Sequence, residues 1–282
     1  MKNFIIRAIT GIFFVAAIVV SFINPLAMTF LFAIVTGLTI WEFTGLVNER
    51  DGVDTNRLIC TVAGVYFFIA VVGFCSELTP STVFIPYLIT VVYLMITELY
   101  AKNPDPIHTW AYTMMSQMYI ALPFSMLGVL AFRGSHEGVV YSWVAPLSVF
   151  VFLWINDTGA YLCGSLLGKH KLFPRISPGK SWEGSIGGFV FVSAIAVLIW
   201  HLAESYGYND LSLNAYEWVG LGLIVAVFGT WGDLVESLFK RTIGIKDSGN
   251  ILPGHGGMLD RFDSSLMAMP AAVVYLYTLT LL

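Results

Sequence analysis

Long apolar runs recur along this chain and restrict its fold more than any other feature. A helix needs roughly 20 apolar residues to cross a bilayer, and windows near that length cover residues 4–23, 26–47, 57–77, 82–100, 107–132, 139–167, 184–203, 216–239 and 263–282. The runs are continuous and lack the alternation of a transmembrane β-barrel. Only 11% of the residues are charged, against about 25% in soluble domains. The sequence therefore predicts an all-α integral membrane protein, a polytopic bundle of about nine transmembrane helices.

Basic residues gather on one side of the predicted membrane. The N-terminus and the segments 48–57, 101–106, 168–183 and 240–262 hold every Lys and Arg except Arg133. By the positive-inside rule, these segments face the cytoplasm. An odd number of spans then places the N-terminus in the cytoplasm and the C-terminus outside. We expect a multi-pass protein of the cell inner (plasma) membrane.

The chain reads as a single integral membrane domain over residues 1–282, without a long linker or a convincing internal repeat. Within it, residues 1–135 form N-terminal helices, and residues 136–282 form the helices and loops that carry the chemistry. The two segments 168–183 and 240–262 hold most of the basic residues. We therefore expect a polar cavity in the C-terminal half that faces the cytoplasm.

The eighth window ends in a polar stripe. Its members recur at helical spacing and share one helix face; they are Asp233, Glu236, Ser237 and Lys240. An acidic side chain inside a membrane span costs about 2.5–3.5 kcal/mol near the centre by insertion scales. The stripe is therefore predicted to face a wet cavity, or alternatively to form a salt-bridged helix contact.

The loop after this stripe combines basic residues, glycines and aspartates. Glycine lets backbone N–H groups turn toward an anion, while Lys and Arg side chains suit phosphate oxygens. Asp260 and Asp263 lie one turn apart if the ninth helix begins here, and with Asp233 they would offer Mg²⁺ the oxygen ligands it prefers. The pattern predicts a Mg-nucleotide site; the alternative is a loop of paired charges.

A second polar segment follows the sixth window. Asp157 lies one turn before Tyr161, and a basic run leads into Ser-Pro-Gly-Lys-Ser-Trp-Glu-Gly. Ser177, followed by proline and with Glu183 ahead of an apolar run, predicts a helix start. A P-loop is excluded because its upstream glycine and preceding strand are missing. Glu42 and Glu98, in earlier windows, are interpreted as interfacial or paired.

Residues 237–263 resemble the signature of phosphatidate cytidylyltransferases, the CDP-diacylglycerol synthases. The shared pattern consists, in chain order, of a serine, Lys-Arg, Lys-Asp, Pro-x-His-Gly-Gly and Asp-Arg-x-Asp. The resemblance extends upstream to Gly-Asp-Leu-Val-Glu-Ser and to the segment ending in Ser-Trp-Glu-Gly, so it covers roughly the C-terminal half. Gly179 stands where the family usually has a lysine.

The resemblance implies transfer of CMP from CTP to phosphatidic acid, giving CDP-diacylglycerol and pyrophosphate in phospholipid biosynthesis. It implies one or two Mg²⁺ ions, with Asp233, Asp260 and Asp263 as metal ligands and, with Lys240 and Lys246, as catalytic residues. The implied substrate-binding residues are Ser237, Arg241, Asp247, His255, Gly256, Gly257, Arg261, Asp157, Tyr161, Ser177, Lys180, Ser181 and Glu183. The implied partners are CTP, phosphatidic acid, the lipid bilayer and a second copy in a homodimer; no nucleic acid is expected.

Two other functions fit parts of the pattern. A cytidylyltransferase for another lipid phosphate would carry the same signature. An anion transporter would place polar residues near the midplane of several helices, across repeats, whereas here they cluster at one face. A CDP-alcohol phosphotransferase is excluded because the string Asp-Gly-x-x-Ala-Arg is absent.

Overall fold

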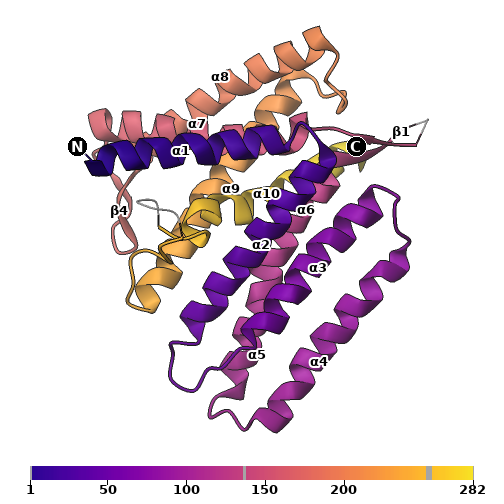
Figure 1. Cartoon of the computed structure of the whole chain (residues 1–282). Coiled ribbons are helices and arrows are strands. Elements are labelled where there is room, and N and C mark those ends of the chain that lie inside the picture. The colour runs from indigo at the N-terminus through magenta and orange to yellow at the C-terminus, as the bar shows by residue number, and fades with distance from the viewer. Residues whose placement is uncertain (1, 136–137, 252–255, 282) are drawn as a thin grey trace. The chain divides into compact units, whose positions relative to one another are not determined.

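The computed structural model describes residues 2–135, 138–251 and 256–281. For residues 2–8, 135, 280 and 281 it describes the backbone alone. It is a helical protein with two short hairpins (Figure 1). Contacts divide the chain into two compact units. The first contains residues 1–141 and 247–262, and the second contains residues 142–246 and 263–282. Whether they act as the expected single domain stays a prediction.

The first unit holds the N-terminal helices. They are α1 (Lys2–Ser21), α2 (Pro25–Val47), α3 (Arg57–Cys75), the short η1 (Ser81–Phe84), α4 (Ile85–Ala101), α5 (Pro106–Met115), the π-helical η2 (Ser116–Ala121) and α6 (Leu122–Ala131). A hairpin of β1 (Phe132–Ser135) and β2 (Gly138–Tyr141) follows. Helix α3 packs between α2 and α4, as Figure 1 shows. The α2–α3 contact is close because Gly64 lies against the side chain of Ile40.

Aromatic side chains form the core of the first unit. The ring of Phe32 lies 5.6 Å from Phe22 and 6.4 Å from Phe124, measured between ring centroids. Phe262 lies 5.3 Å from Phe124 and 5.5 Å from Phe14. Because Phe262 follows the charged loop directly, this core anchors the C-terminal end of that loop within the unit. Aromatic pairs at such separations add to the stabilisation from burial alone.

The second unit contains α7 (Val144–Leu167), the hairpin of β3 (Lys171–Phe173) and β4 (Ser177–Ser181), α8 (Trp182–Tyr206), α9 (Ala215–Thr242) and most of α10 (Leu259–Leu281). Helices α7 and α8 approach closely at small residues. A Cβ at Gly184 would lie 2.8 Å from the Ala160 carbonyl oxygen, and one at Gly159 would lie 3.1 Å from the Cα of Gly188. Small residues four apart are a common basis for close helix packing in membranes.

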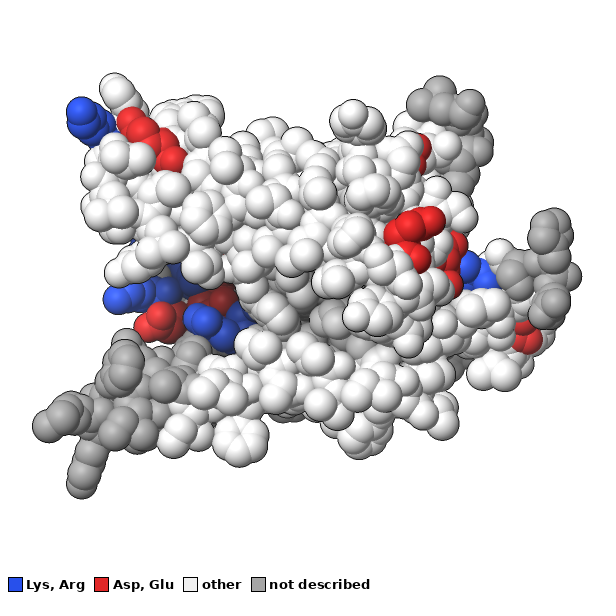
Figure 2. Space-filling view, turned by 90° about the horizontal axis from the view of Figure 1, so that it is seen from above, with Lys and Arg blue, Asp and Glu red and all other residues white. Residues whose placement is uncertain are grey.

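The fold class is confirmed. Within the described residues, eight helices are long and apolar enough to cross a membrane, and the apolar part of α1, Ile9–Ser21, is shorter. Most of the surface visible in Figure 2 carries no Lys, Arg, Asp or Glu. The protein is a polytopic all-α membrane protein.

Two predicted helix starts were wrong. The sixth helix begins at Val144 and not at residue 139, because residues 138–141 pair with β1 in a hairpin. The helix after the second polar segment begins at Trp182, capped by Ser181 and not by Ser177. Ser177 instead lies in β4, opposite Phe173. Neither hairpin was predicted, because their strands are only three to five residues long.

Replacing Gly232 by alanine is expected to destabilise the second unit. A Cβ there would lie 2.6 Å from the backbone oxygen of Asp263 and 3.0 Å from the Cα of Ser264. Overpacking of this kind costs about 1–3 kcal/mol, more than the roughly 1 kcal/mol that alanine gains in helix propensity. The measurement is the midpoint of thermal aggregation in detergent. Gly179→Ala is the control, since its Cβ enters open space; an equal or higher midpoint for Gly232→Ala would contradict the packing.

Candidate active site

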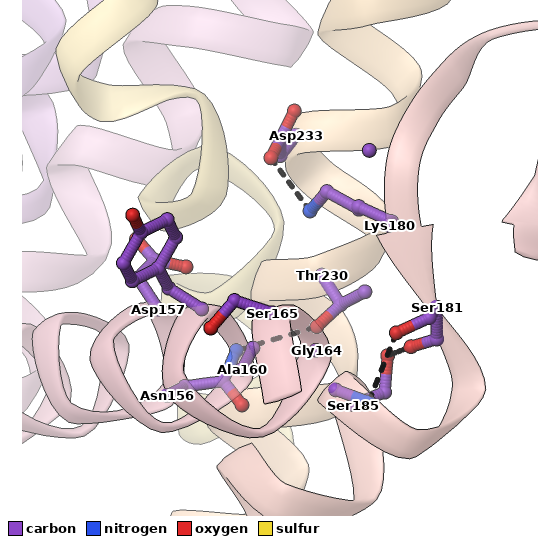
Figure 3. Close-up of a pocket in the computed structure, with 13 residues that line it drawn as sticks. Asn156, Asp157, Ala160, Gly164, Ser165, Lys180, Ser181, Ser185, Thr230 and Asp233 are labelled. Atoms are coloured by element: carbon purple, nitrogen blue, oxygen red, sulfur yellow. Dashed lines mark hydrogen bonds and ion pairs between the residues drawn. The ribbon is translucent and has the colours of Figure 1, made fainter. Parts of the chain in front are cut away.

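A cavity of about 400 Å³ opens in the second unit (Figure 3). Its walls come from α7, β4, α8 and α9. They are formed by Asn156, Asp157, Ala160, Tyr161, Gly164, Ser165, Gly179, Lys180, Ser181, Gly184, Ser185, Thr230 and Asp233. Five predicted site residues lie among them. The close packing of α7 on α8 brings the wall residues of these two helices together.

An ion pair crosses this cavity. The Nζ of Lys180, on β4, lies 2.6 Å from Oδ2 of Asp233, on α9, and both side chains are partly exposed. Figure 3 shows the two side chains pointing toward each other. The hydroxyl of Ser237 donates to Oδ1 of Asp233 at 3.1 Å. The cavity thus presents a cation and a carboxylate side by side, which suits a phosphate group and a metal ion.

The start of α10 adds a further carboxylate near Asp233. Asp263 lies within electrostatic range of Asp233, Asp157 and Lys240. Its Oδ1 accepts a hydrogen bond from the backbone N–H of Ser264 at 2.5 Å. Gly232 allows the backbones of α9 and α10 to touch at this point. Three predicted aspartates from different apolar windows are therefore gathered in one region of the second unit.

The polar stripe on α9 is confirmed. Besides the bond from Ser237 to Asp233, the Nζ of Lys240 lies 2.6 Å from Oε2 of Glu236. Glu236 is fully buried and the Lys240 side chain is 12% exposed. Asp233 lines a cavity, as the first interpretation predicted. The ion pair of Glu236 and Lys240 lies within α9, so it is not the contact between helices that the alternative predicted.

The hairpin β3–β4 is fixed by Glu183 rather than by Ser177. The carboxylate of Glu183 accepts hydrogen bonds from the backbone N–H groups of Lys169 and His170, at 3.1 and 3.2 Å. It also lies 2.6 Å from Nδ1 of His170. The cavity lining contains neither Ser177 nor Glu183. Glu183 therefore holds the loop that carries Lys180, while Ser177 remains a prediction without a contact to this cavity.

The signature loop belongs to the first unit from Asp247 to Phe262. There the Oδ2 of Asp260 accepts hydrogen bonds from the backbone N–H groups of Ser248 and Gly257, both at 2.8 Å. Gly256 adopts a positive φ of 84°, and a Cβ on it would lie 2.5 Å from Oδ2 of Asp260. The glycines of the signature thus make room for a carboxylate.

The remaining signature residues are basic or acidic side chains at the surface. Arg241 donates to the backbone oxygen of Ile245, beyond the end of α9, at 3.2 Å. The exposed residues of this group are Arg241, Lys246, Asp247 and Arg261. His255 lies outside the described residues, so its predicted role is not tested by the structure.

Sequence reasoning missed several cavity residues. Asn156 donates from Nδ2 to Oγ1 of Thr230 at 3.3 Å, joining α7 to α9 in the cavity wall (Figure 3). Ser185 also lines the cavity and bonds to the backbone oxygen of Ser181 at 3.2 Å. For Asn156 the available signal was a polar side chain inside an apolar window, next to Asp157.

Metal binding stays a prediction. Among the residues that the structure describes, no three His, Cys, Asp or Glu side chains form a group placed to hold a metal ion. The donor chemistry nevertheless fits Mg²⁺, since Asp233 and Asp263 supply carboxylate oxygens in one region.

The chain is similar to known proteins along most of its length. The sequence profile of the cytidylyltransferase family matches residues 4–279. The chain belongs to the cytidylyltransferase family. A phosphatidate cytidylyltransferase of Staphylococcus aureus (strain COL) is 45% identical over 170 residues, which is 60% of each protein. One from Staphylococcus haemolyticus is 37% identical over 191 residues, or 67% of this chain and 68% of that protein.

A third similar protein is the phosphatidate cytidylyltransferase of Staphylococcus epidermidis, at 41% identity over 170 residues. The alignments with the S. aureus and S. epidermidis proteins each cover 60% of the relative's length, less than two thirds.

Replacing Ser181 by alanine should weaken the start of α8. Its Oγ accepts a hydrogen bond from the backbone N–H of Gly184 at 3.2 Å, and loss of such a cap costs about 1 kcal/mol. Ser177→Ala is the matched control, because Ser177 lies in β4 and caps no helix. Thermal midpoints in detergent should fall for Ser181→Ala alone; a larger fall for Ser177→Ala would restore the sequence-based assignment.

Proposed function

We propose that the protein is a CTP:phosphatidate cytidylyltransferase, which makes CDP-diacylglycerol and pyrophosphate. The observation that carries the proposal is the cavity with Lys180 and Asp233 side by side, in a membrane protein of the cytidylyltransferase family. The names of the relatives agree with the proposal. A lipid substrate fits a helical bundle in the membrane, and a polyanionic nucleotide fits a charged cavity.

The proposed reaction is a phosphoryl-type substitution. An anionic oxygen of the phosphatidate phosphate forms a bond to the α-phosphorus of CTP, and the bond from that phosphorus to the bridging oxygen breaks as pyrophosphate leaves. The phosphate of phosphatidate is already ionised at neutral pH, so the reaction needs no dedicated general base. Positioning and neutralisation of charge then account for catalysis.

In this proposal, Lys180 binds a phosphate oxygen of the substrates, and Ser237 orients Asp233 through its hydrogen bond. Glu183 and Ser181 hold the hairpin that carries Lys180, and Asp157 and Tyr161 form the opposite wall. Lys240, Lys246, Arg241, His255 and Arg261 are proposed phosphate ligands from their positions in the signature.

Asp233, Asp260 and Asp263 are the proposed Mg²⁺ ligands, from their residue type and their signature positions. Asp233 and Asp263 belong to the second unit and Asp260 to the first. A bound Mg²⁺ would supply charge neutralisation of the phosphate oxygens. The number of ions, one or two, is part of the proposal.

The orientation is proposed from the basic residues. The N-terminus, the β3–β4 hairpin and the signature loop would face the cytoplasm, where CTP is found, and the C-terminus would lie outside. The relatives are bacterial, which supports a plasma membrane location. A homodimer is proposed from the family resemblance alone.

The rival functions differ in what they predict. A cytidylyltransferase for another lipid phosphate would use the same cavity, so purified protein offered different lipid phosphates separates the two. An anion transporter would move solute across liposomes without CTP. The gathering of Asp157, Asp233, Asp263, Lys180 and Lys240 in one unit favours an enzyme.

Asp233→Asn should abolish incorporation of CTP-derived label into lipid by purified protein supplied with phosphatidic acid and Mg²⁺. The loss should be at least about 100-fold, because Asp233 is a proposed ligand of the Mg²⁺ that would neutralise the phosphate charge in the transition state. Asp260→Asn should behave alike. Asp210→Asn, in an exposed loop between α8 and α9, is the matched control and should retain activity.

Omitting Mg²⁺ should reduce wild-type incorporation as strongly as Asp233→Asn does. Full activity of correctly inserted Asp233→Asn and Asp260→Asn proteins would refute the assignment of these aspartates.

A further inference from the structure

Glu42 is a buried carboxylate far from the signature in sequence but next to it in the structure. It lies near the C-terminal end of α2, is 8% exposed, and is separated from Ser248 by 206 residues. An acidic group inside an apolar helix is costly to insert, by about 2.5–3.5 kcal/mol near the bilayer centre. Such a group requires compensating partners within the protein.

Within the described residues, the hydrogen-bond partners of Glu42 come from the signature loop. Its Oε1 accepts hydrogen bonds from the hydroxyl of Ser248 and from the backbone N–H of Leu259, the latter at 3.1 Å. Its Oε2 accepts one from the backbone N–H of Met258 at 2.9 Å. These N–H groups lie at the start of α10, where the helix cannot supply their acceptors. A negative charge is also favoured at a helix N-terminus.

Ser248 connects Glu42 to Asp260. While its hydroxyl donates to Glu42, the same oxygen accepts from the backbone N–H of Asp260 at 3.3 Å. The backbone N–H of Ser248 donates to Oδ2 of Asp260 at 2.8 Å. One serine therefore contacts both carboxylates, one from α2 and one from α10.

Glycines of the signature leave room for both carboxylates. A Cβ at Gly249 would lie 2.7 Å from Oε2 of Glu42, and a Cβ at Gly257 would overlap the same carboxylate. A Cβ at Gly256 would lie 2.5 Å from Oδ2 of Asp260. The Gly-Gly pair of the signature is thus explained partly by a side chain outside the signature.

We propose that Glu42 is a positioning residue for the cytidylyl transfer: it fixes Ser248 and the start of α10, and through them the carboxylate of Asp260. This inference rests on the proposed function, in which Asp260 is a metal ligand. Glu42 acts through Asp260. A loop rich in glycine is flexible because glycine restricts the backbone little. The buried carboxylate of Glu42 accepts hydrogen bonds from three groups of this loop and so restricts its motion.

The test is Glu42→Gln in the full-length protein. Glutamine keeps the shape but has one oxygen, so at least one backbone N–H at the start of α10 loses its acceptor. We expect kcat to fall about 10- to 100-fold, as for groups that orient metal ligands, and the Mg²⁺ concentration for half-maximal rate to rise. The KM for CTP should change less than about twofold, because positioning acts on the transition state.

A second readout does not depend on activity. Amide hydrogen exchange in peptides covering residues 256–262 should become about tenfold faster in Glu42→Gln, as expected when a hydrogen bond is lost. Glu49→Gln is the matched control, since Glu49 is exposed just beyond α2, and should change neither exchange nor rate. Ser248→Ala removes the connecting hydroxyl without altering Glu42, and should reproduce both effects if Glu42→Gln fails to insert.

The outcomes are separable. Wild-type kcat and Mg²⁺ dependence in a folded Glu42→Gln protein would overturn the proposal, and so would unchanged exchange in residues 256–262. An inactive wild type would refute the proposed function instead. In that case faster amide exchange in Glu42→Gln would still support the proposal that Glu42 positions Asp260. Unchanged exchange would refute that proposal.

Discussion

A charge within an apolar helix bundle must find its partner inside the protein, and this constraint organises both units. In the second unit, Asp233 pairs with Lys180 and Glu236 pairs with Lys240. In the first unit, Glu42 is satisfied by a hydroxyl and by backbone N–H groups of the signature loop. Desolvation makes each unpaired ion expensive. The Lys180–Asp233 pair joins β4 to α9, the Glu236–Lys240 pair lies within α9, and Glu42 joins α2 to the signature loop.

The two kinds of partner have different consequences for chemistry. An ion pair such as Lys180 and Asp233 can exchange its partner for a phosphate or a metal ion, because each group keeps its charge and lies at a cavity. A carboxylate bound to backbone N–H groups cannot be exchanged in this way, and it fixes the chain instead. In the second unit, Lys180 and Asp233 therefore carry exchangeable charges. In the first unit, Asp260 is held by the backbone N–H groups of Ser248 and Gly257.

Much of this could be predicted from sequence. Hydrophobic windows predicted the membrane helices, and helical spacing placed Asp233 and Ser237 on one face. Contacts between distant segments could not be predicted, because nothing in a single sequence links Glu42 to Ser248 or Lys180 to Asp233. The cap of α8 was misassigned because two serines precede it, and only the β3–β4 pairing decides between Ser177 and Ser181.

The central claim is transfer of CMP to a lipid phosphate, and the position of the transferred label tests it most directly. Purified protein in liposomes containing phosphatidic acid would receive Mg²⁺ and CTP labelled at either the α- or the γ-phosphate. The α-label should appear in lipid, and the γ-label should appear only in pyrophosphate. Label from the γ-phosphate in lipid, or no lipid label from either position, would contradict the claim.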